Sequence, residues 1–464
     1  MPPAPSELPE RTCTLLRRSV LKIPWGVCAG PFGPSASTGA DVRHGRSSEK
    51  GVETAAEVRT VRWRRLGVGA TPGLHRQPER EILDQRWVEH SGQSLAELVT
   101  WLRSKTTASP DNVAVAIELP RGSVVETLME QGFAVFSINP KQLDRFRDRY
   151  SPAGAKDDRR DAFVLADSLR TDMRCFHTVR LDEPATIRLR ELSRLDDDLR
   201  LEQNRVHNQL REQWHRFFPQ LLQLNPAADE PWVWDLFQTV PLPGKAVKLP
   251  ATRVQRILAK HRIRRIDVPQ VQAILAATPL SVAPGAAEAA SEHALLLLPR
   301  LRLLQQQRTA ISKRIDTLLE ELAKPDQTDS ETIEHRDAEV LLSLPGVGRQ
   351  IAATMLGEAS QAIAERDYHG LRCYTGAAPV TRQSGKKKVV LMRQGCNERL
   401  RNALYHWSRV SVVYDPKSKI EYAAMRAKGH SHGRALRGIA DHWLTVLLSM
   451  LRHHTLYDPQ RRPA

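Results

Sequence analysis

The segment from Val113 to Ile138 constrains the fold of this chain most strongly. Val113-Ala-Val-Ala-Ile117 is a short, continuous apolar run that predicts a buried strand, and Phe133–Ile138 is a second one. A Pro-Arg-Gly turn and a helical pattern lie between them. This strand–helix–strand unit predicts an α/β domain with a mostly parallel sheet, whose ligands lie beyond the carboxyl ends of the strands. Glu118 lies at such an end.

Two long apolar stripes follow, within about 185–222 and 301–322. Spacings of three and four residues predict two helices that pair as an antiparallel coiled coil or serve a dimer. Core-facing helices of a bundle are the alternative. Residues 226–290 between them start Pro-rich and contain a short basic helical pair, and we expect them to be an insertion. The stripes consist of Leu189, Leu192, Leu195, Leu199, Val206 and Leu210, and of Leu301, Leu304, Ile311, Ile315, Leu318 and Leu322.

The polar run Pro325-Asp-Gln-Thr-Asp-Ser marks a further boundary, and helix signals then continue to about Tyr457. In residues 1 to about 80, Pro, Gly, Ser and Arg are frequent, and apolar residues do not recur with a sustained period of two or 3.6 residues. No packed element is therefore expected in this segment. The predicted organisation has four parts. Residues 1–80 form a disordered or misread segment and 81–180 an incomplete α/β domain. Residues 181–325 form coiled-coil helices and 335–457 a mostly helical C-terminal domain.

Charge favours a polyanionic partner. The chain has 69 Lys and Arg against 53 Asp and Glu, a formal net charge of +16. Nucleic acid is the first expectation, although a basic protein without such a partner has the same balance.

Cysteine spacing and hydropathy exclude other classes. The five cysteines include no CxxC pair, which argues against a zinc knuckle or a disulfide framework and fits a reducing cytoplasm. No apolar run approaches the roughly 18 residues that a membrane span needs. We therefore expect a cytoplasmic protein with no membrane contact.

An acidic pair begins a predicted helix. In Lys156-Asp-Asp-Arg-Arg-Asp161, Asp158 and Asp161 stand three residues apart and share a helix face. With Glu118 opposite them, three carboxylates would form a site suited to Mg²⁺, which supports phosphoryl transfer. Acidic residues in a first helical turn are also favoured by the helix dipole alone, so a simple charged segment is the alternative.

A glycine turn lies between two helical patterns at Leu344-Pro-Gly-Val-Gly348. It is similar to a helix-hairpin-helix motif, in which exposed backbone N–H groups bind a DNA phosphate. Gly346, Gly348 and Arg349 would then contact DNA. An ordinary Pro-Gly turn between helices would need no ligand.

Ser384 stands before a glycine and the run Lys386-Lys387-Lys388. A serine hydroxyl becomes a nucleophile when a base or metal activates it, and neighbouring cations can hold the phosphate that it attacks. Ser384 is therefore a candidate nucleophile, and the lysines with Arg393 are candidate DNA contacts. A polar turn with solvated charges is the alternative.

Taken in order, these segments resemble the DEDD-type transposases of bacterial insertion sequences, which have a RuvC-like N-terminal domain, a C-terminal serine domain and a bridge RNA. The resemblance covers about residues 91–457. It rests on Ala116-Ile-Glu118, Ile138-Asn-Pro140, Lys156-x-Asp158-x-x-Asp161-Ala, Leu344-Pro-Gly-Val-Gly348, Tyr374-Thr-Gly-Ala-Ala-Pro379, Gln383-Ser384-Gly385 and Gly395-Cys-Asn-Glu-Arg-Leu-Arg401.

The resemblance implies a site-specific DNA recombinase. Glu118, Asp158 and Asp161 would be catalytic Mg²⁺ ligands, and Ser384 would form a phosphoserine link that conserves the phosphodiester bond energy. It also implies a homodimer or homotetramer in which the α/β and serine domains meet across protomers. A noncoding guide RNA would select the DNA sites by base pairing.

One family feature is missing. The family's first aspartate follows a Gly-hydrophobic pattern on an opening strand, and here the nearest match is Gly67-Val-Gly69. Asp84 fits a second or third strand and not the missing ligand. We therefore expect a sheet without its first strand, with an exposed edge and a weaker metal site, and an inactive copy. The abrupt composition change near Glu81 suggests a frameshift or a misassigned start.

Two other functions remain open. A nuclease similar to a Holliday-junction resolvase would need the acidic site but not Ser384. A non-catalytic nucleic-acid-binding protein would need neither.

Overall fold

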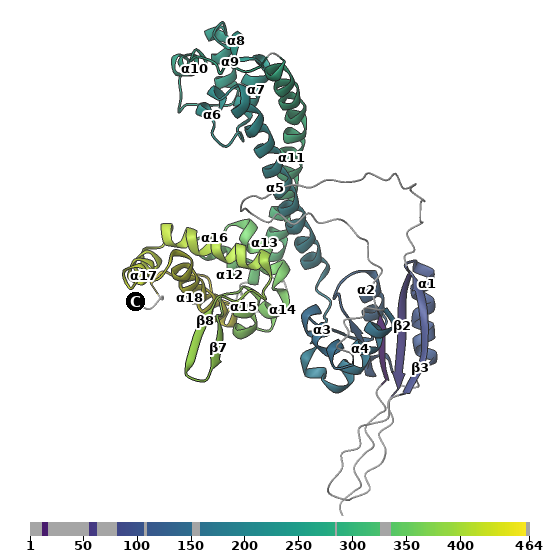
Figure 1. Ribbon diagram of the computed structural model, residues 1–464. Helices are drawn as coiled ribbons and strands as arrows, with labels where there is room; N and C mark the ends of the chain where they lie inside the picture. The colour runs from purple at the N-terminus through teal and green to yellow at the C-terminus, as the bar shows by residue number, and fades with distance from the viewer. Residues whose placement is uncertain are drawn as a thin grey trace, which may run out of the picture. The chain divides into compact units, whose positions relative to one another are not determined.

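A computed structural model of the chain describes its backbone in seven stretches: 12–16, 55–62, 81–105, 109–150, 158–283, 285–324 and 336–460. The chain forms two compact units, Met1–Leu181 and Asp182–Ala464. Figure 1 labels their α-helices and some of their strands. None of the described helices is both long and apolar enough to cross a membrane.

The first unit contains a six-stranded mixed sheet of order β3-β2-β1-β4-β5-β6. Only the central pairs β1–β4 and β4–β5 are parallel, whereas β1–β2, β2–β3 and β5–β6 are antiparallel. The prediction of a mostly parallel sheet is therefore correct only for the central strands. It is wrong at the edges, where β2 and β3 form antiparallel pairs before the first crossover helix and β6 pairs antiparallel with β5. The strands span Thr12–Leu16, Ala55–Arg62, Glu81–Glu89, Val113–Ile117, Ala134–Ser137 and His177–Thr178.

Strand β4 is buried on both faces. Val113, Val115 and Ile117 join a core with helices α1 and α2, while Ala114 and Ala116 join one with α3 and α4. Alternation of side chains across the strand explains this division. The α/β layout expected around this strand is thus present. The helices span Gly92–Ser104, Ser123–Glu130, Pro140–Asp148 and Asp158–Thr171, with short 3₁₀ turns η1 at Pro110–Asn112 and η2 at Met173–Cys175.

The expectation that 1–80 contains no packed element is wrong at two stretches. Thr12–Leu16 forms β1 between β2 and β4, and Ala55–Arg62 forms β2. The strand that was expected to be missing is therefore present as β1. It is paired on both sides, so it leaves no exposed edge between β2 and β4. These short strands pair with residues far away in the sequence, so local periodicity does not reveal them. The sequence of β1, Thr-Cys-Thr-Leu-Leu, nevertheless contains no carboxylate.

The second unit is built on two long helices, α5 (Pro184–Phe217) and α11 (Ala286–Ala323). They pack side by side in antiparallel directions, as Figure 1 shows. Arg308 donates to Asp196 at 3.1 Å, and Arg300 donates to Glu202 at 2.8 Å. The stripes at 189–210 and 301–322 thus belong to paired helices; their supercoiling stays a prediction.

One end of the helix pair carries a helical tip. Its core is aromatic, with Trp214, Trp232, Trp234, Phe217 and Phe237 buried together. The expected short helical pair corresponds to α9 and α10, but of these two only α9 is basic. The Pro-rich start also forms helices, because Pro231 and Pro243 occupy first-turn positions where proline is favoured. The tip helices α6–α10 span Gln220–Leu224, Pro231–Thr239, Pro243–Ala246, Ala251–Lys260 and Val268–Leu275.

The other end joins the C-terminal helices in a second core, where Leu189 and Ile315 of the pair meet Trp407 and Trp443. A hairpin, β7 (Val380–Ser384) with β8 (Lys387–Leu391), projects from these helices in Figure 1. The helices α12–α18 span Asp337–Ser343, Arg349–Glu358, Ser360–Ala364, Tyr368–Tyr374, Glu398–Tyr414, Pro416–Ala427 and His432–His453.

Candidate functional site

The acidic residues lie where the sheet and α4 meet. Glu118 directly follows β4 and is half-buried, and Asp161 is fully buried on the first turns of α4. Asp158 begins α4, but its side chain is outside the described part of the chain. Within the described residues, no group of three or more His, Cys, Asp or Glu side chains is arranged to hold a metal.

Asp161 is engaged by an arginine. Arg147 Nε donates to Asp161 Oδ1 at 2.6 Å, and its Nη1 donates to Asp144 at 2.6 Å. Burial lowers the pKa of Arg147, but the hydrogen bonds and charges of Asp161 and Asp144 outweigh it and raise the pKa. Carboxylate oxygens suit Mg²⁺, yet a cation bound to Asp161 competes with this guanidinium.

Two further carboxylates of the first unit have structural partners. Asp84 lies on the third strand, as expected, where Lys105 Nζ approaches it at 2.5 Å and Trp101 Nε1 donates to it at 3.3 Å. Asp167, which the sequence interpretation missed, is buried on α4 and pairs with Arg170 at 2.5 Å. Its only sequence signal was the i, i+3 spacing to Arg170.

The turn between α12 and α13 packs against α16. Gly346 has φ +84°, and a Cβ there would lie 2.8 Å from Ser411 Oγ. The carbonyl of Pro345 accepts from Trp407 Nε1 and Ser411 Oγ, both at 3.0 Å. Gly346 therefore serves packing within the chain.

Gly348 differs from Gly346. It is the exposed N-cap of α13, and a Cβ there would meet nothing within 4 Å. Arg349 is exposed and lies 3.0 Å from Glu320 and 3.6 Å from Asp316, both on α11. The N-terminus of α13 is thus open to an anion through Gly348, while Arg349 is partly neutralised.

Ser384 lies at the exposed tip of the β7–β8 hairpin. It pairs with Lys387 across a turn in which Gly385 has φ +55°. Lys386, Lys387 and Lys388 are exposed beside it. Among the described residues, no hydrogen bond to the Ser384 hydroxyl and no neighbouring base is recorded, so this hairpin presents a hydroxyl and cations without an activating group.

Arg393 and Arg401 hold the base of the hairpin. Arg393 Nε donates to the carbonyl of Ala378 at 3.2 Å. Arg401 Nη2 donates to the carbonyls of Arg393 at 3.1 Å and Gln394 at 3.0 Å. Arg393, a predicted DNA contact, is half-buried, and its Nε is used within the chain.

Asn397 begins α16 and links the hairpin base to α13. Its Oδ1 accepts from the backbone of Arg399 and Leu400, and its Nδ2 donates to Glu358 at 2.9 Å. Burial raises the pKa of Glu358, but hydrogen bonds and charge from Arg194, with help from Asn397 and Arg399, lower it overall. Sequence reasoning missed this network because its members lie far apart in the chain.

Comparison with known proteins covers both units. Residues 75–219 match a transposase family profile of IS110 DEDD type, and 338–423 match one described as transposase of the IS116/IS110/IS902 family. The putative transposase y4uE of Sinorhizobium fredii is 43% identical over 277 residues, 58% of this chain and 75% of its own length.

A second relative extends the similarity over most of the chain. The mini-circle putative transposase for IS117 of Streptomyces coelicolor is 30% identical over 373 residues, 79% of this chain and 87% of its own length. The uncharacterized 42 kDa protein of insertion element IS900 from Mycobacterium paratuberculosis is 27% identical over 82% of this chain and 92% of its own length. The chain belongs to the IS116/IS110/IS902 family of transposases.

Proposed function

We propose that this transposase moves an insertion sequence by DNA strand cleavage and rejoining through a phosphoserine at Ser384. The observation that best supports this proposal is the exposed hairpin tip, where Ser384 lies beside Lys386–Lys388. Ser384 Oγ attacks a DNA phosphorus as the Oγ proton leaves, an Oγ–P bond forms, and one P–O bond of the strand breaks. The leaving DNA hydroxyl takes up a proton. Attack by another DNA hydroxyl reverses these steps, so rejoining needs no ATP.

The acidic half of the reaction is assigned to the first unit. Its central parallel strands β1, β4 and β5 with flanking helices support a RuvC-like domain. Glu118, Asp158 and Asp161 would hold Mg²⁺, which when bound neutralises charge on the reacting phosphate. Asp161 would have to exchange Arg147 for the metal. The matched IS110 DEDD-type profile supports a divalent metal.

Activation of Ser384 would come from a second copy of the chain. Within the described residues the hairpin tip has no base, so an acidic domain supplied by another protomer would complete the site. The paired helices α5 and α11, as a coiled coil, would support the dimer or tetramer. A guide RNA would select the DNA sites.

DNA would contact the C-terminal domain at two places. Gly348, with Gly346 and Arg349 in a helix-hairpin-helix-like turn, would present backbone N–H groups to one phosphate. Lys386, Lys387 and Lys388 would hold the phosphate that Ser384 attacks, and Arg393 would position their hairpin. Binding of this kind would associate the protein with the nucleoid.

Trapping a covalent adduct tests this proposal. The chain would be incubated with Mg²⁺, RNA from its own element and labelled insertion-end DNA, then denatured and analysed for protein–DNA adducts by mass spectrometry. An adduct on Ser384 is expected, and S384A should abolish it. Thr381→Val, on the same strand β7, is the matched control and should retain it. Cleavage that survives S384A would favour a resolvase-like nuclease.

A non-catalytic nucleic-acid-binding role is the second candidate. The observation favouring it is that β1 supplies no carboxylate to the sheet centre. It predicts DNA binding with neither cleavage nor adduct at any Mg²⁺ concentration, and an adduct on Ser384 would exclude it.

A further inference from the structure

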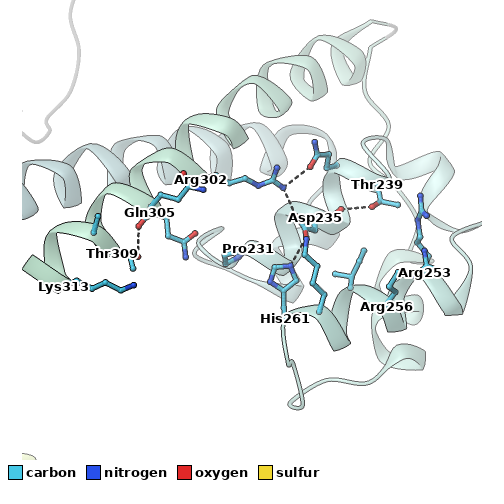
Figure 2. A pocket seen from close by; sticks show the side chains of 15 residues that line it. Pro231, Asp235, Thr239, Arg253, Arg256, His261, Arg302, Gln305, Thr309 and Lys313 are labelled. Carbon is cyan, nitrogen blue, oxygen red and sulfur yellow. Dashed lines mark hydrogen bonds and ion pairs between the residues drawn. The ribbon is translucent and has the colours of Figure 1, made fainter.

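A basic groove lies between the long helix α11 and the tip helices α7 and α9, which belong to the segment to which the sequence assigned no role. It encloses about 1140 Å³ between α7, α9 and α11. Figure 2 shows side chains from all three helices lining it. The acidic and basic residues among them are Asp235, Arg253, Arg256, Lys260, His261, Arg302 and Lys313.

Two helices turn cationic and polar stripes toward the groove. Arg253, Arg256 and Lys260 stand at i, i+3 and i+7 on α9, so they share one face. Val254, Ile257 and Leu258 of α9 are buried in the aromatic core, and Ile257 also borders the groove beside the cations. Packing of these apolar side chains therefore fixes the direction of the cationic face. Across the groove, Arg302, Gln305, Gln306, Thr309 and Lys313 form the stripe of α11.

Asp235 organises three of these groups from the floor of the groove. Its Oδ2 lies 2.6 Å from Lys260 Nζ and 2.8 Å from His261 Nε2, and its Oδ1 accepts from Arg302 at 2.7 Å. Burial raises the pKa of Asp235, but its bonds to His261 and Lys260 lower it overall. One carboxylate thus holds groups from α9, the loop after it and α11 in one arrangement.

The remaining cations of the groove have no acidic partner among the described residues. In the described part of the protein, no carboxylate partner is recorded for Arg253, Arg256 or Lys313, and all three are exposed. Five Lys and Arg side chains line the groove against one carboxylate. The groove therefore carries an excess of positive charge directed at solvent.

We propose that this groove binds the phosphodiester backbone of a nucleic-acid duplex. The cations of α9 extend over about 10 Å and those of α11 over about 16 Å, at 1.5 Å of helix rise per residue. A strand carries one phosphate about every 3.4 Å of axis, so the groove faces several phosphates and exceeds a single small anion. The side-chain amides of Gln305 and Gln306 add neutral donors. The site is separate from the Ser384 hairpin and does not depend on the proposed chemistry.

Duplex binding by the full chain tests the groove. Fluorescence anisotropy would be measured with DNA and RNA duplexes of about 20 base pairs at several salt concentrations between about 50 and 200 mM. The variant R253Q/R256Q/K313Q removes three cations that form no ion pair with the described residues. We expect its affinity to fall roughly 10- to 100-fold, and the salt slope for DNA to decrease by up to about 2.7. The matched control R205Q/R211Q/R264Q removes three exposed arginines that do not line the groove.

A photo-crosslinking amino acid at Gln306 locates the contact. The proposal is supported when the groove variant loses affinity and Gln306 crosslinks to at least one of the two duplexes. The duplex that crosslinks shows whether the groove binds DNA, RNA or both. Unchanged affinity in the groove variant, equal loss in the control variant, or no crosslink overturns the proposal. Neither the affinity nor the crosslink at Gln306 requires strand cleavage or a Ser384 adduct, so failure of the serine mechanism and failure of the groove are separable.

Discussion

Arg194 on α5 and Glu358 at the end of α13 form a two-pronged ion pair, with Nε–Oε1 at 2.6 Å and Nη2–Oε2 at 3.0 Å. The Glu358 side chain is only 5% exposed, whereas Arg194 is 22% exposed. This pair connects the first long helix to the helices below the Ser384 hairpin. Asn397, at the hairpin base, shares the same carboxylate.

Removing one partner of this pair should be costly. R194M leaves the Glu358 carboxylate buried without its guanidinium, and we expect the free energy of unfolding to fall by about 3 kcal/mol, measured by urea denaturation. Arg200→Met is the matched control, since Arg200 pairs with Asp197 at a more exposed site and should contribute at most about 1 kcal/mol. Equal losses in the two variants would contradict the prediction.

The two glycines of the α12–α13 turn should respond differently to alanine. Gly346→Ala places a Cβ against Ser411 at positive φ, so we expect a loss of about 2 kcal/mol or more in the free energy of unfolding. Gly348→Ala has φ −85° and open space, so stability should change by less than about 0.5 kcal/mol. Thermal unfolding of both variants checks this, and a stable Gly346→Ala protein would refute the packing role.

His207 should make the tip sensitive to acid. Burial and the charge of Arg308 lower the pKa of His207, against an opposing effect of Asp229. The folded state therefore keeps His207 neutral while the unfolded chain protonates near pH 6.5, so this contribution to stability is complete above about pH 6.5 and is lost as the pH falls toward the folded pKa.

Tryptophan fluorescence measures this effect, because Trp234 lies 5.8 Å from the His207 ring, centroid to centroid. Urea midpoints followed between about pH 7.5 and 5 should fall more steeply for the unmodified chain than for H207Q. Parallel profiles would show that His207 does not contribute.

Arg147 should oppose magnesium binding at Asp161. Because Arg147 neutralises this carboxylate, R147Q should raise Mg²⁺ affinity by roughly tenfold, equivalent to about 1.4 kcal/mol. Calorimetric titration measures the affinity, and R147Q/D161N should abolish the gain. Weaker Mg²⁺ binding in R147Q would show that Arg147 supports the metal site instead.

The elements that the sequence predicted best are those whose signal is local. Val113–Ile117 is apolar throughout and is buried as predicted, and the leucine spacing at 189–210 and 301–322 does mark helices. By contrast, β1 and β2 form through long-range pairing, and Asp161 was expected to face a metal although Arg147 engages it. Ser384 was predicted as a nucleophile from its sequence neighbours, and that role stays a prediction. Its position at an exposed hairpin tip depends on the hydrogen bonds that Arg393 and Arg401 make at the hairpin base.

The antiparallel pairing of α5 and α11 also bears on how this chain can change during evolution. The tip begins after Phe217 and ends before Ala286, so the chain leaves and re-enters the helix pair at one end. An insertion joined in this way can lengthen, shorten or be exchanged without displacing the segments on either side of it. The α7 and α9 wall of the basic groove can therefore diverge among insertion sequences while the α11 wall and the hairpin domain stay constant.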